Sequence, residues 1–538
     1  MTERLNEQRE EQAWIELGET RVAPAVARFL VGAFLATILV VPAVQLFAGA
    51  STWPSLFAAF PTACTLEAFE RDLEDASVVG QGLRPRWQAL VVGALGLGNE
   101  QVYPGRDGWL FHRPGVDYVT GPGFLDADVQ RARVLGADPC IAVPQPDPVA
   151  AIVEFAAQLG DRGIELVVVP TPVKAVVAPD RLVAGATGPL QNESWSAFVA
   201  GLEDAGVGVF DPTPLLAPDD FLPTDTHWRP PAVARVAAAL SEMLQAHVPL
   251  TSPVGGEFER TVASAANVGD LTTMLDLPAA RERALVENVE TAPVRAASGG
   301  ESLAAGADVL LLGDSFSNIY SSREAFAQQT ADGAALDWGA DAGLAEQLAF
   351  ELGRPVDRIV RNAGGAHATR VALAAEVARE ARAGRDRLAG VRVVVYQFAM
   401  RELAKGDWRA VTIEPLPRGS VAPAPVVGEG VQRITGTLRA RGPLPRPGTV
   451  PYPEALVALH LGDVEGAGGA DQVVVYVWGM REHAWTDAAR WPAGTRLTLD
   501  VQPWEEEEVQ RRHATTSRGE LDDMELLVLP AYFGEPAR

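Results

Sequence analysis

Short apolar runs alternate with longer amphipathic segments between about residues 148 and 398. Five runs have strand character: Ile164–Pro170, Val207–Phe210, Asp308–Leu312, Asp357–Arg361 and Val391–Phe398. Five segments have helical periodicity: Pro148–Arg162, Trp195–Asp204, Pro231–Gln245, Leu344–Leu352 and Thr369–Ala383. Apolar strands that alternate with helices are typical of a mostly parallel sheet covered on both faces. We therefore predict an α/β fold for this part of the chain.

The pattern changes after about Pro415, where proline and glycine become frequent. Short runs with strand character follow one another there: Val431–Arg439, Ala455–Leu461, Val473–Trp478, Thr495–Val501 and Glu525–Leu529. Several short strands without intervening helices predict a small antiparallel sandwich or barrel. We expect a separate C-terminal all-β domain.

An apolar stretch near the N-terminus, Phe29–Ala50, contains no charged residue. Its length suffices to cross a hydrocarbon core of about 30 Å as a helix. Four arginines precede it and no basic residue follows before Arg71, so the positive-inside rule places the preceding tail in the cytoplasm. We predict a single-pass anchor in the cytoplasmic membrane with the rest of the chain outside, in the periplasm. Two alternatives stay open: a signal peptide cleaved near Ala48-Gly49-Ala50, and a buried soluble helix.

These patterns predict a multidomain organisation for the 538 residues. The expected parts are a cytoplasmic tail (1–28), a transmembrane anchor (29–50), a linker (51–100), an α/β catalytic domain (101–414) and a β-rich domain (415–538).

The net charge of −25 argues against a nucleic-acid partner, since an acidic surface repels phosphate backbones. The chain has two cysteines, Cys64 and Cys140, and no Cys-x-x-Cys or histidine cluster, so we expect no zinc site, and no cofactor is predicted. The two thiols are either separate buried residues or one disulfide formed in an oxidising compartment.

One predicted strand stops abruptly at Gly313-Asp314-Ser315. In parallel sheets the ligand crevice lies beyond the carboxyl ends of the strands, so a serine here is a candidate nucleophile. The alternative is that Ser315 or Ser317 caps the helix that follows.

A serine nucleophile needs a general base, usually a histidine oriented by a carboxylate. Asp225 and His227, in the segment Pro223–Trp228, are two residues apart, so in an extended loop their side chains point the same way. The alternative is that Asp225 or Thr226 caps the helix predicted from Pro231.

Together, Gly-Asp-Ser-Phe at 313–316 and Thr-Asp-Thr-His-Trp at 224–228 resemble the AlgJ/AlgX family of alginate O-acetyltransferases, which has an SGNH-hydrolase-like domain. Further similar segments are Asp107–Phe111, Pro170–Lys174 and Phe398–Leu403, so the resemblance covers about residues 100–410. It implies an SGNH-like fold, Ser315 as nucleophile, His227 as base and Asp225 as the residue that orients the base. Ordinary SGNH hydrolases have a later Asp-x-x-His instead, which favours the acetyltransferase branch.

The oxyanion and substrate residues are less well defined by the sequence. The Ser315 N–H is one expected donor, and the block Asn362–Gly365, with Gly364, resembles the second part of an oxyanion hole; alternatively it is a glycine turn. Arg401 would bind substrate or pair with Glu402. We expect Asp314 to stabilise its turn.

The resemblance implies a polysaccharide O-acetyltransferase with an acyl-serine intermediate and a multi-spanning membrane protein that supplies the acetyl group. A carbohydrate acetyl esterase of the same fold would use the same triad. The third alternative is a non-catalytic envelope module whose β domain binds a glycan, with four tryptophans as candidate contacts: Trp478, Trp485, Trp491 and Trp504.

Overall fold

A computed structural model describes residues 23–47, isolated residues between 62 and 74, and residues 77–537 with gaps. The gaps are 140–142, 187, 251–256, 298–301, 330–334, 383, 414–430, 446, 448–449, 451, 505, 514–515, 522–525 and 527–528. Cys64 and Cys140 lie outside the described residues, so their pairing stays a prediction. Two compact units divide between Pro85 and Arg86.

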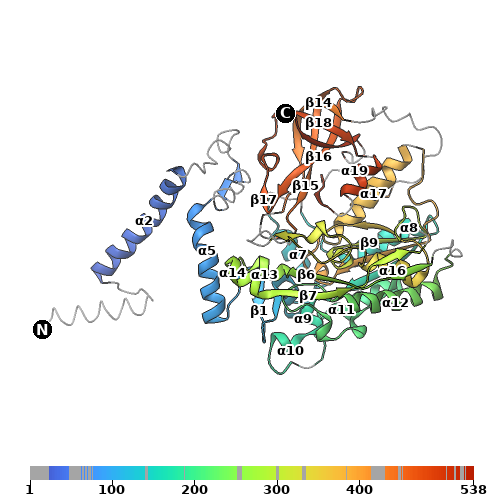
Figure 1. Ribbon diagram of the computed structural model, residues 1–538, viewed down its shortest axis with the longest axis horizontal. Helices are drawn as coiled ribbons and strands as arrows, with labels where there is room; N and C mark the ends of the chain where they lie inside the picture. Colours follow the sequence, from blue (N-terminus) through green and yellow to red (C-terminus); the bar gives the residue numbers. More distant parts are fainter. Residues whose placement is uncertain are drawn as a thin grey trace. The chain divides into compact units, whose positions relative to one another are not determined.

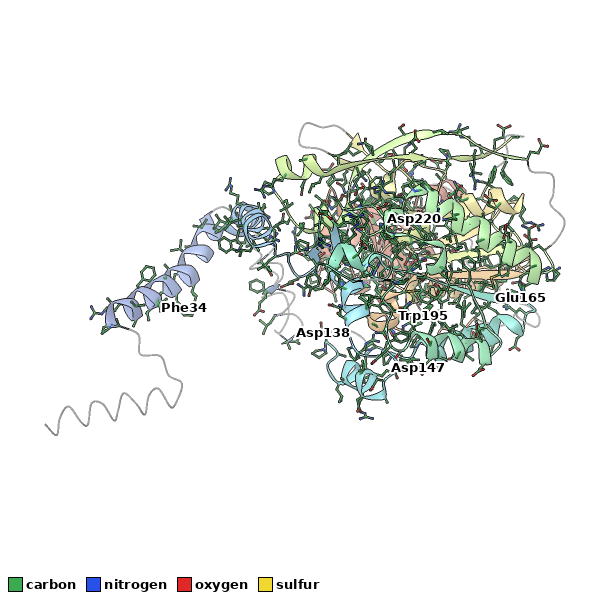
Figure 2. The ribbon with its side chains drawn as sticks, turned by 90° about the horizontal axis from the view of Figure 1, so that it is seen from below. Phe34, Asp138, Asp147, Glu165, Trp195 and Asp220 are labelled. Carbon is green, nitrogen blue, oxygen red and sulfur yellow. The ribbon has the colours of Figure 1, made fainter. Side chains whose placement is uncertain are left out.

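The N-terminal unit contains helix α2 (Pro24–Phe47), which carries most of the predicted anchor. The large apolar side chains that the structure describes on this helix are exposed, and Figure 2 shows Phe34 projecting from it. Within the described part of the chain, however, no helix combines the length and apolar character that a membrane crossing requires. The transmembrane helix predicted over Phe29–Ala50 is therefore not confirmed, and Ala48–Ala50 lie outside the described residues.

The central sheet of the second unit contains all five predicted strands. They are β3 (Glu165–Thr171), β4 (Gly208–Val209), β9 (Val309–Gly313), β12 (Asp357–Val360) and β13 (Val393–Ala399). Their order is β12-β9-β13-β3-β4, and every neighbouring pair is parallel. The predicted α/β fold with a parallel sheet is confirmed, and each strand lies within two residues of its expected limits.

The five predicted helices are also present: α8 (Pro148–Gly160), α11 (Trp195–Asp204), α12 (Pro230–His247), α16 (Leu344–Leu352) and α17 (His367–Arg382). Local signals define their ends. The side chain of Asp147, labelled in Figure 2, accepts from Val149 N and Ala150 N at the start of α8, and Gly353 adopts a φ of 64° after α16. In Figure 1, α17 lies on one side of the sheet and α12 and α16 on the other, as right-handed crossovers require.

Shorter elements precede or connect these strands and helices. They are β1 (Val102–Pro104), β2 (Leu110–His112), α6 (Arg113–Thr120), α7 (Ala127–Leu135), α9 (Lys174–Val177), α10 (Pro179–Leu182), α15 (Ser315–Asn318), β10 (Gln328–Gln329), β11 (Ala335–Leu336) and α18 (Arg401–Lys405). Preceding β1 are α5 (Val78–Leu90) and a π-helical turn (Val91–Leu95), so part of the predicted linker is helical.

An insertion between α12 and β9 was not predicted. It contains β5 (Phe258–Arg260), β6 (Ala263–Val268), α13 (Asp270–Met274), α14 (Ala279–Glu282), β7 (Val286–Thr291) and β8 (Val294–Ala296). The strands pair as two antiparallel ribbons, β5 with β8 and β6 with β7. This insertion matters because it contacts the candidate active site.

The C-terminal region forms a second sheet with its own apolar cores. Its elements are β14 (Gln432–Arg441), β15 (Ala455–Glu465), β16 (Gln472–Arg481), β17 (Ala484–Trp485), β18 (Arg496–Pro503), α19 (Glu507–His513), β19 (Ser517–Gly519) and β20 (Ala531–Pro536). Pairing of β16 with both β15 and β20 closes the sheet into a barrel. The predicted C-terminal β domain is confirmed, whereas its boundary at residue 415 stays a prediction.

Two details of the predicted β domain are wrong. The sheet is not wholly antiparallel, since β16–β20 and β15–β19 are parallel pairs. The last strand is β20 rather than Glu525–Leu529; of that segment Leu526 and Leu529 are described, and neither lies in a strand. Within β20 the neighbouring aromatic residues Tyr532 and Phe533 are buried in different apolar cores, as expected for successive residues of a strand.

The stability of the catalytic domain should depend on β9, whose side chains are fully buried. We predict that Leu311→Ala lowers the free energy of unfolding by about 2–5 kcal/mol, because it leaves a cavity between helices and sheet. Leu135→Ala is the matched control: Leu135 is 79% exposed, and the change should stay within about 0.5 kcal/mol. Urea unfolding of both variants tests this, and equal losses would contradict the assignment of β9 to the core.

Candidate active site

Strand β9 ends in a turn that places Ser315 at the edge of the sheet. The Asp314 side chain accepts from Phe316 N at 2.9 Å and thereby caps α15, so the cap is Asp314 rather than Ser315 or Ser317. The same carboxylate accepts from Gln397 Nε2 at 2.9 Å and from Ala399 N at 2.8 Å, both in β13. Asp314 therefore fastens the turn to the neighbouring strand.

The second loop, between β4 and α12, carries the candidate base. It is closed by a bridge between Phe221 and Trp228 and by a bond from Leu222 N to His227 O (3.1 Å). Lys174 supports it from α9, where its ammonium donates to Pro223 O at 3.1 Å and to Leu110 O at 2.9 Å. Burial lowers the pKa of Lys174 to about 8. These contacts hold the loop over the sheet.

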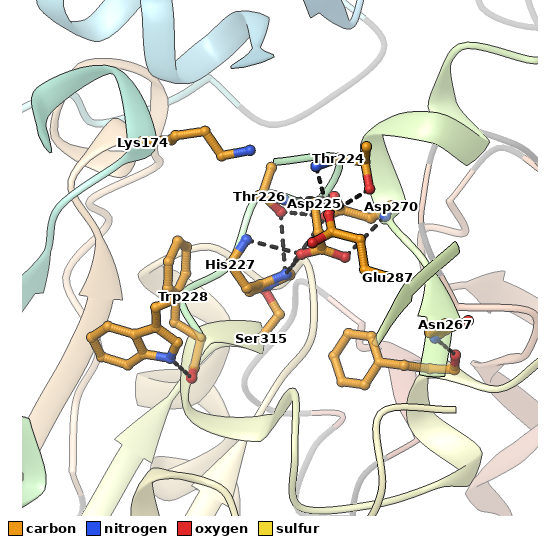
Figure 3. A network of polar contacts seen from close by, with 12 residues as sticks. Lys174, Thr224, Asp225, Thr226, His227, Trp228, Asn267, Asp270, Glu287 and Ser315 are labelled. Atoms are coloured by element: carbon orange, nitrogen blue, oxygen red, sulfur yellow. Dashed lines mark hydrogen bonds and ion pairs between the residues drawn. The ribbon is translucent and has the colours of Figure 1, made fainter. Parts of the chain in front are cut away.

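The three predicted triad residues lie together in one chain of hydrogen bonds, shown in Figure 3. Asp225 Oδ1 is 2.6 Å from His227 Nδ1, and His227 Nε2 is 2.8 Å from Ser315 Oγ. Asp225 and His227 are 1% exposed and Ser315 is 7% exposed. In this geometry a neutral imidazole donates from Nδ1 to Asp225 and accepts the Ser315 proton at Nε2.

The two loops are also bonded to each other beside the triad. Trp228 Nε1 donates to Phe316 O at 3.0 Å, and the Tyr320 hydroxyl donates to Trp228 O at 2.7 Å. The His227 ring packs against the Phe316 ring with 4.8 Å between their centroids. These contacts, made by residues close in sequence to His227 and Ser315, keep the two side chains next to each other.

The electrostatics of the pair favour an ion pair between Asp225 and His227. Burial disfavours charge on both groups, but their mutual attraction and hydrogen bonds outweigh it. The pKa of Asp225 consequently lies below its usual value, and the pKa of His227 lies above its usual value. A base with a raised pKa loses the proton only at higher pH, so activity that needs neutral His227 should fall on acidification.

A second carboxylate, Asp270 in α13, lies beside the triad and was missed in the sequence. Asp225 Oδ2 accepts from Asp270 N at 2.9 Å, while Asp270 Oδ1 accepts from Thr226 N at 2.7 Å and Oδ2 from the Thr226 hydroxyl. Asp270 Oδ2 is also 3.7 Å from His227 Nδ1. In the sequence Asp270 is marked only by a Gly-Asp pair before a short apolar stretch. This pattern is typical of an ordinary helix start and does not indicate a catalytic role.

The ligand atoms of Asp225, His227 and Asp270 lie within 4.8 Å of one another, which is close enough to consider a metal ion. The oxygens already accept hydrogen bonds from backbone and side-chain donors, and Nδ1 is bonded to Asp225. A cation would have to displace these bonds, so the donor set fits a hydrogen-bonded triad better than a metal centre.

Ser315 opens onto a cavity of about 470 Å³, which is also lined by Gly364, Arg401 and His112. Arg401 lies 3.7 Å from the Glu402 carboxylate, the pairing that was one of its two expected roles, while a contact with substrate stays a prediction. Burial, and then the nearby Arg401, keep the pKa of His112 well below its usual value and so disfavour protonation of this imidazole.

Asn362 does not itself line this cavity, although the next residues, Ala363 and Gly364, do. Its Oδ1 accepts from Asn318 Nδ2, in α15, at 3.2 Å. Its buried Nδ2 has no hydrogen-bond partner among the described residues. The structure thus places an unpaired amide donor next to α15, while Gly364 lines the cavity itself.

A family model described as "SGNH hydrolase-like domain, acetyltransferase AlgX" matches residues 102–399. The chain belongs to this family. The match spans the parallel sheet, both loops of the triad and the insertion that carries Asp270. The predicted relationship to AlgJ/AlgX-type SGNH acetyltransferases is thereby confirmed.

Two curated relatives of this AlgX-type family are similar in sequence. The probable alginate O-acetylase AlgJ of Pseudomonas syringae pv. tomato is 30% identical over 251 residues, 43% of this chain and 58% of the relative. That of Pseudomonas aeruginosa is 28% identical over 240 residues, 43% of this chain and 56% of the relative. The chain thus covers less than two thirds of either relative.

Two solved structures are also similar to this chain. The O-acetyltransferase domain of Pseudomonas putida AlgJ has 21% identity, covers 56% of this chain and 92% of that chain, and has a TM-score of 0.39. Pseudomonas aeruginosa AlgX has 14% identity, covers 75% of this chain and 91% of that chain, and has a TM-score of 0.38.

The glycine before Asp314 should be required for the geometry of the nucleophile turn. A Cβ at Gly313 would lie against the Ser317 hydroxyl and 2.7 Å from Ser317 Cβ, so the turn would have to shift. We predict that Gly313→Ala lowers turnover by about 10²-fold, the effect of misplacing a catalytic group by about 1 Å. Gly160→Ala, with no atom near the added Cβ, is the control and should retain turnover. Hydrolysis of p-nitrophenyl acetate measures both; wild-type turnover in Gly313→Ala would contradict the prediction.

Proposed function

We propose that this protein is a membrane-anchored polysaccharide O-acetyltransferase that works outside the cytoplasm through an acetyl-serine intermediate. The observation that carries the proposal is the continuous Asp225–His227–Ser315 chain, with bonds of 2.6 and 2.8 Å, beside a cavity. Relatives named alginate O-acetylase support a polysaccharide as acceptor.

In the first half of the reaction, Ser315 Oγ attacks the carbonyl carbon of an acetyl ester donor. His227 Nε2 takes the Ser315 proton and then gives it to the departing alkoxide, while Asp225 stabilises the imidazolium. The bond between the donor oxygen and the acetyl carbon breaks, and the products are acetyl-Ser315 and the donor alcohol.

In the second half, a sugar hydroxyl attacks acetyl-Ser315. His227 takes the proton of that hydroxyl and returns it to Ser315 Oγ as the acyl–serine bond breaks. The products are an acetylated sugar and the free serine, so the triad ends in its starting state. Water as the attacking group would make the protein an acetyl esterase, which is the alternative that the assay below separates.

Each tetrahedral intermediate needs hydrogen-bond donors for its oxyanion. The Ser315 N–H at the start of α15, the Gly364 region in the cavity wall and the unpaired amide of Asn362 are the proposed donors. Arg401 is proposed to contact the substrate, since it lines the same cavity. Removing one oxyanion donor typically costs about 10²–10³ in turnover.

The location outside the cytoplasm is supported by the charge-free stretch Phe29–Ala50 and the arginines before it. In α2 this stretch presents exposed apolar side chains, as a membrane anchor would. A protein outside the membrane has no direct access to cytoplasmic acetyl-CoA. A multi-spanning membrane partner that passes the acetyl group outward is therefore part of the proposal.

Substitutions in the triad should abolish acetyl transfer and leave the fold intact. We predict that Ser315→Ala and His227→Ala each lower turnover by about 10⁴-fold or more, and that the two together lower it no further, because triad members act as a unit. Asp225→Asn should cost about 10⁴-fold through the wrong imidazole tautomer. The assay follows p-nitrophenol release from p-nitrophenyl acetate and, by mass spectrometry, the acetylation of added oligosaccharides.

Ser196→Ala is the matched control, because Ser196 is an exposed serine on α11 and should be silent. Melting temperatures of all variants separate loss of turnover from loss of fold. Retained transfer in folded Ser315→Ala would overturn the mechanism. Acetate release without acetylated sugar, for every oligosaccharide tried, would favour the esterase.

The proposed topology predicts where a reporter is active. Alkaline phosphatase fused after Ala50 should be active, since its disulfides form only outside the cytoplasm. The matched fusion after Arg21 should be inactive, because the preceding tail would stay inside. Equal, low activity of both fusions would refute the anchor and the site of action, but not the triad.

A further inference from the structure

Asp270 lies beside the triad but belongs to neither of the two loops that carry it. It is 3% exposed and comes from the first turn of α13, in the insertion between α12 and β9. The preceding Gly269 lets the chain approach the base loop closely: a Cβ there would lie 2.4 Å or less from the Thr224 backbone. The insertion is thus fitted against the base loop at this point.

The contacts between Asp270 and the base loop are reciprocal. The Asp270 carboxylate accepts from both the backbone N–H and the hydroxyl of Thr226, which lies between the two catalytic residues of the loop. In return, the Asp270 N–H donates to Asp225 Oδ2 at 2.9 Å. Each oxygen of Asp225 therefore has its own donor, with His227 on one and the insertion on the other.

Besides positioning the loop, Asp270 places a carboxylate close to the His227 imidazole. Asp270 Oδ2 lies 3.7 Å from His227 Nδ1, so the imidazole faces two carboxylates rather than one. A negative charge at this distance stabilises the protonated ring and makes it harder to deprotonate. The same side chain thus affects both the orientation and the basicity of the base.

We propose that Asp270 is a positioning residue that holds the Asp225–His227 loop in its reactive conformation and places a second negative charge beside the imidazole. The proposal rests on the proposed role of His227 as the base. It assigns a role to the insertion, in which α13 follows directly on β6 and packs its apolar residues against Val102 and Leu110.

Other charged groups act on the same cluster. Lys174 approaches from α9, and Glu287 from β7 accepts from Thr224 N at 2.7 Å while pairing with Arg229 at 3.3 Å. Arg401 from α18 opposes protonation of His227. Burial, and then the charge of Asp225, raise the pKa of Asp270 to about 6. Above that pH both carboxylates are charged, so the effect of Asp270 on His227 is greatest there.

Asp270→Asn separates the two roles. An asparagine oxygen still accepts from Thr226 N and its amide still bonds to the Thr226 hydroxyl, so the position is kept while the charge is lost. The His227 pKa should fall by about 1 unit. Asp270→Ala loses the contacts as well and should lower the plateau rate by at least about 10-fold.

The control is Asp357→Asn, the same change at another buried carboxylate, at the amino end of β12. Asp357 is 4% exposed and accepts from Arg387 at 2.7 Å and from Gly306 N at 2.8 Å. This variant should leave both the His227 pKa and the plateau rate unchanged, because it lies at the opposite end of the sheet from Ser315.

Two measurements on the full-length protein test the two proposed roles of Asp270. The first is an NMR titration of histidine labelled with ¹³C at Cε1, with the His227 signal assigned from His227→Gln. The second is the pH dependence of Ser315 modification by phenylmethanesulfonyl fluoride, which reports the neutral base without any acetyl donor or acceptor. We expect Asp270→Asn to shift both titrations to lower pH, with a plateau rate within about 3-fold of wild type.

A His227 pKa in Asp270→Asn within about 0.2 unit of the wild-type value would overturn the second-charge role. A plateau rate in folded Asp270→Ala equal to that of wild type would overturn the positioning role. If instead the wild-type Ser315 is not modified at any pH, the proposed function fails, and the NMR titration still decides the influence of Asp270 on His227.

Discussion

The hydrogen bond between His227 Nε2 and Ser315 Oγ joins two loops that are 88 residues apart in the chain, and the surrounding structure holds its two ends. Neither loop can move independently. Asp314 ties the serine turn to β13, and the Trp228 indole bonds the base loop to the serine turn. Because proton transfer needs hydrogen-bond distance, small displacements of either loop are costly. The parallel sheet matters to function because it brings these loop ends to one edge.

Maintaining this geometry requires burying three carboxylates, those of Asp225, Asp270 and Asp314. An isolated buried carboxylate costs several kcal/mol, so each must be surrounded by donors. Main-chain N–H groups meet much of that need: His227 N and Asp270 N for Asp225, Thr226 N for Asp270, and Phe316 N and Ala399 N for Asp314. Main-chain donors are available only in particular backbone conformations, so the charges that serve catalysis also specify the conformation of the loops.

The sequence alone predicted those parts of the structure whose residue pattern has a single physical cause. Buried parallel strands must be apolar on both faces, so β3, β9 and β13 appear as unbroken runs. The triad could be predicted because its residues stand at the ends of such runs and match a family motif. The insertion around Asp270 could not, since its short ribbons are only partly buried and lack a clear period. Asn362 matched a motif, but only tertiary contacts reveal its bond to Asn318.

The abrupt end of β9 at Gly-Asp-Ser combines three separate requirements. The first position must be glycine because the Ser317 side chain occupies the space where a Cβ would lie. The second is a carboxylate because one group must cap α15 and also accept from β13. The third presents its hydroxyl to His227. Cβ clearance, cap and nucleophile are thus set by different neighbours, and a change at Gly313 or Asp314 would move the turn that presents the Ser315 hydroxyl to His227.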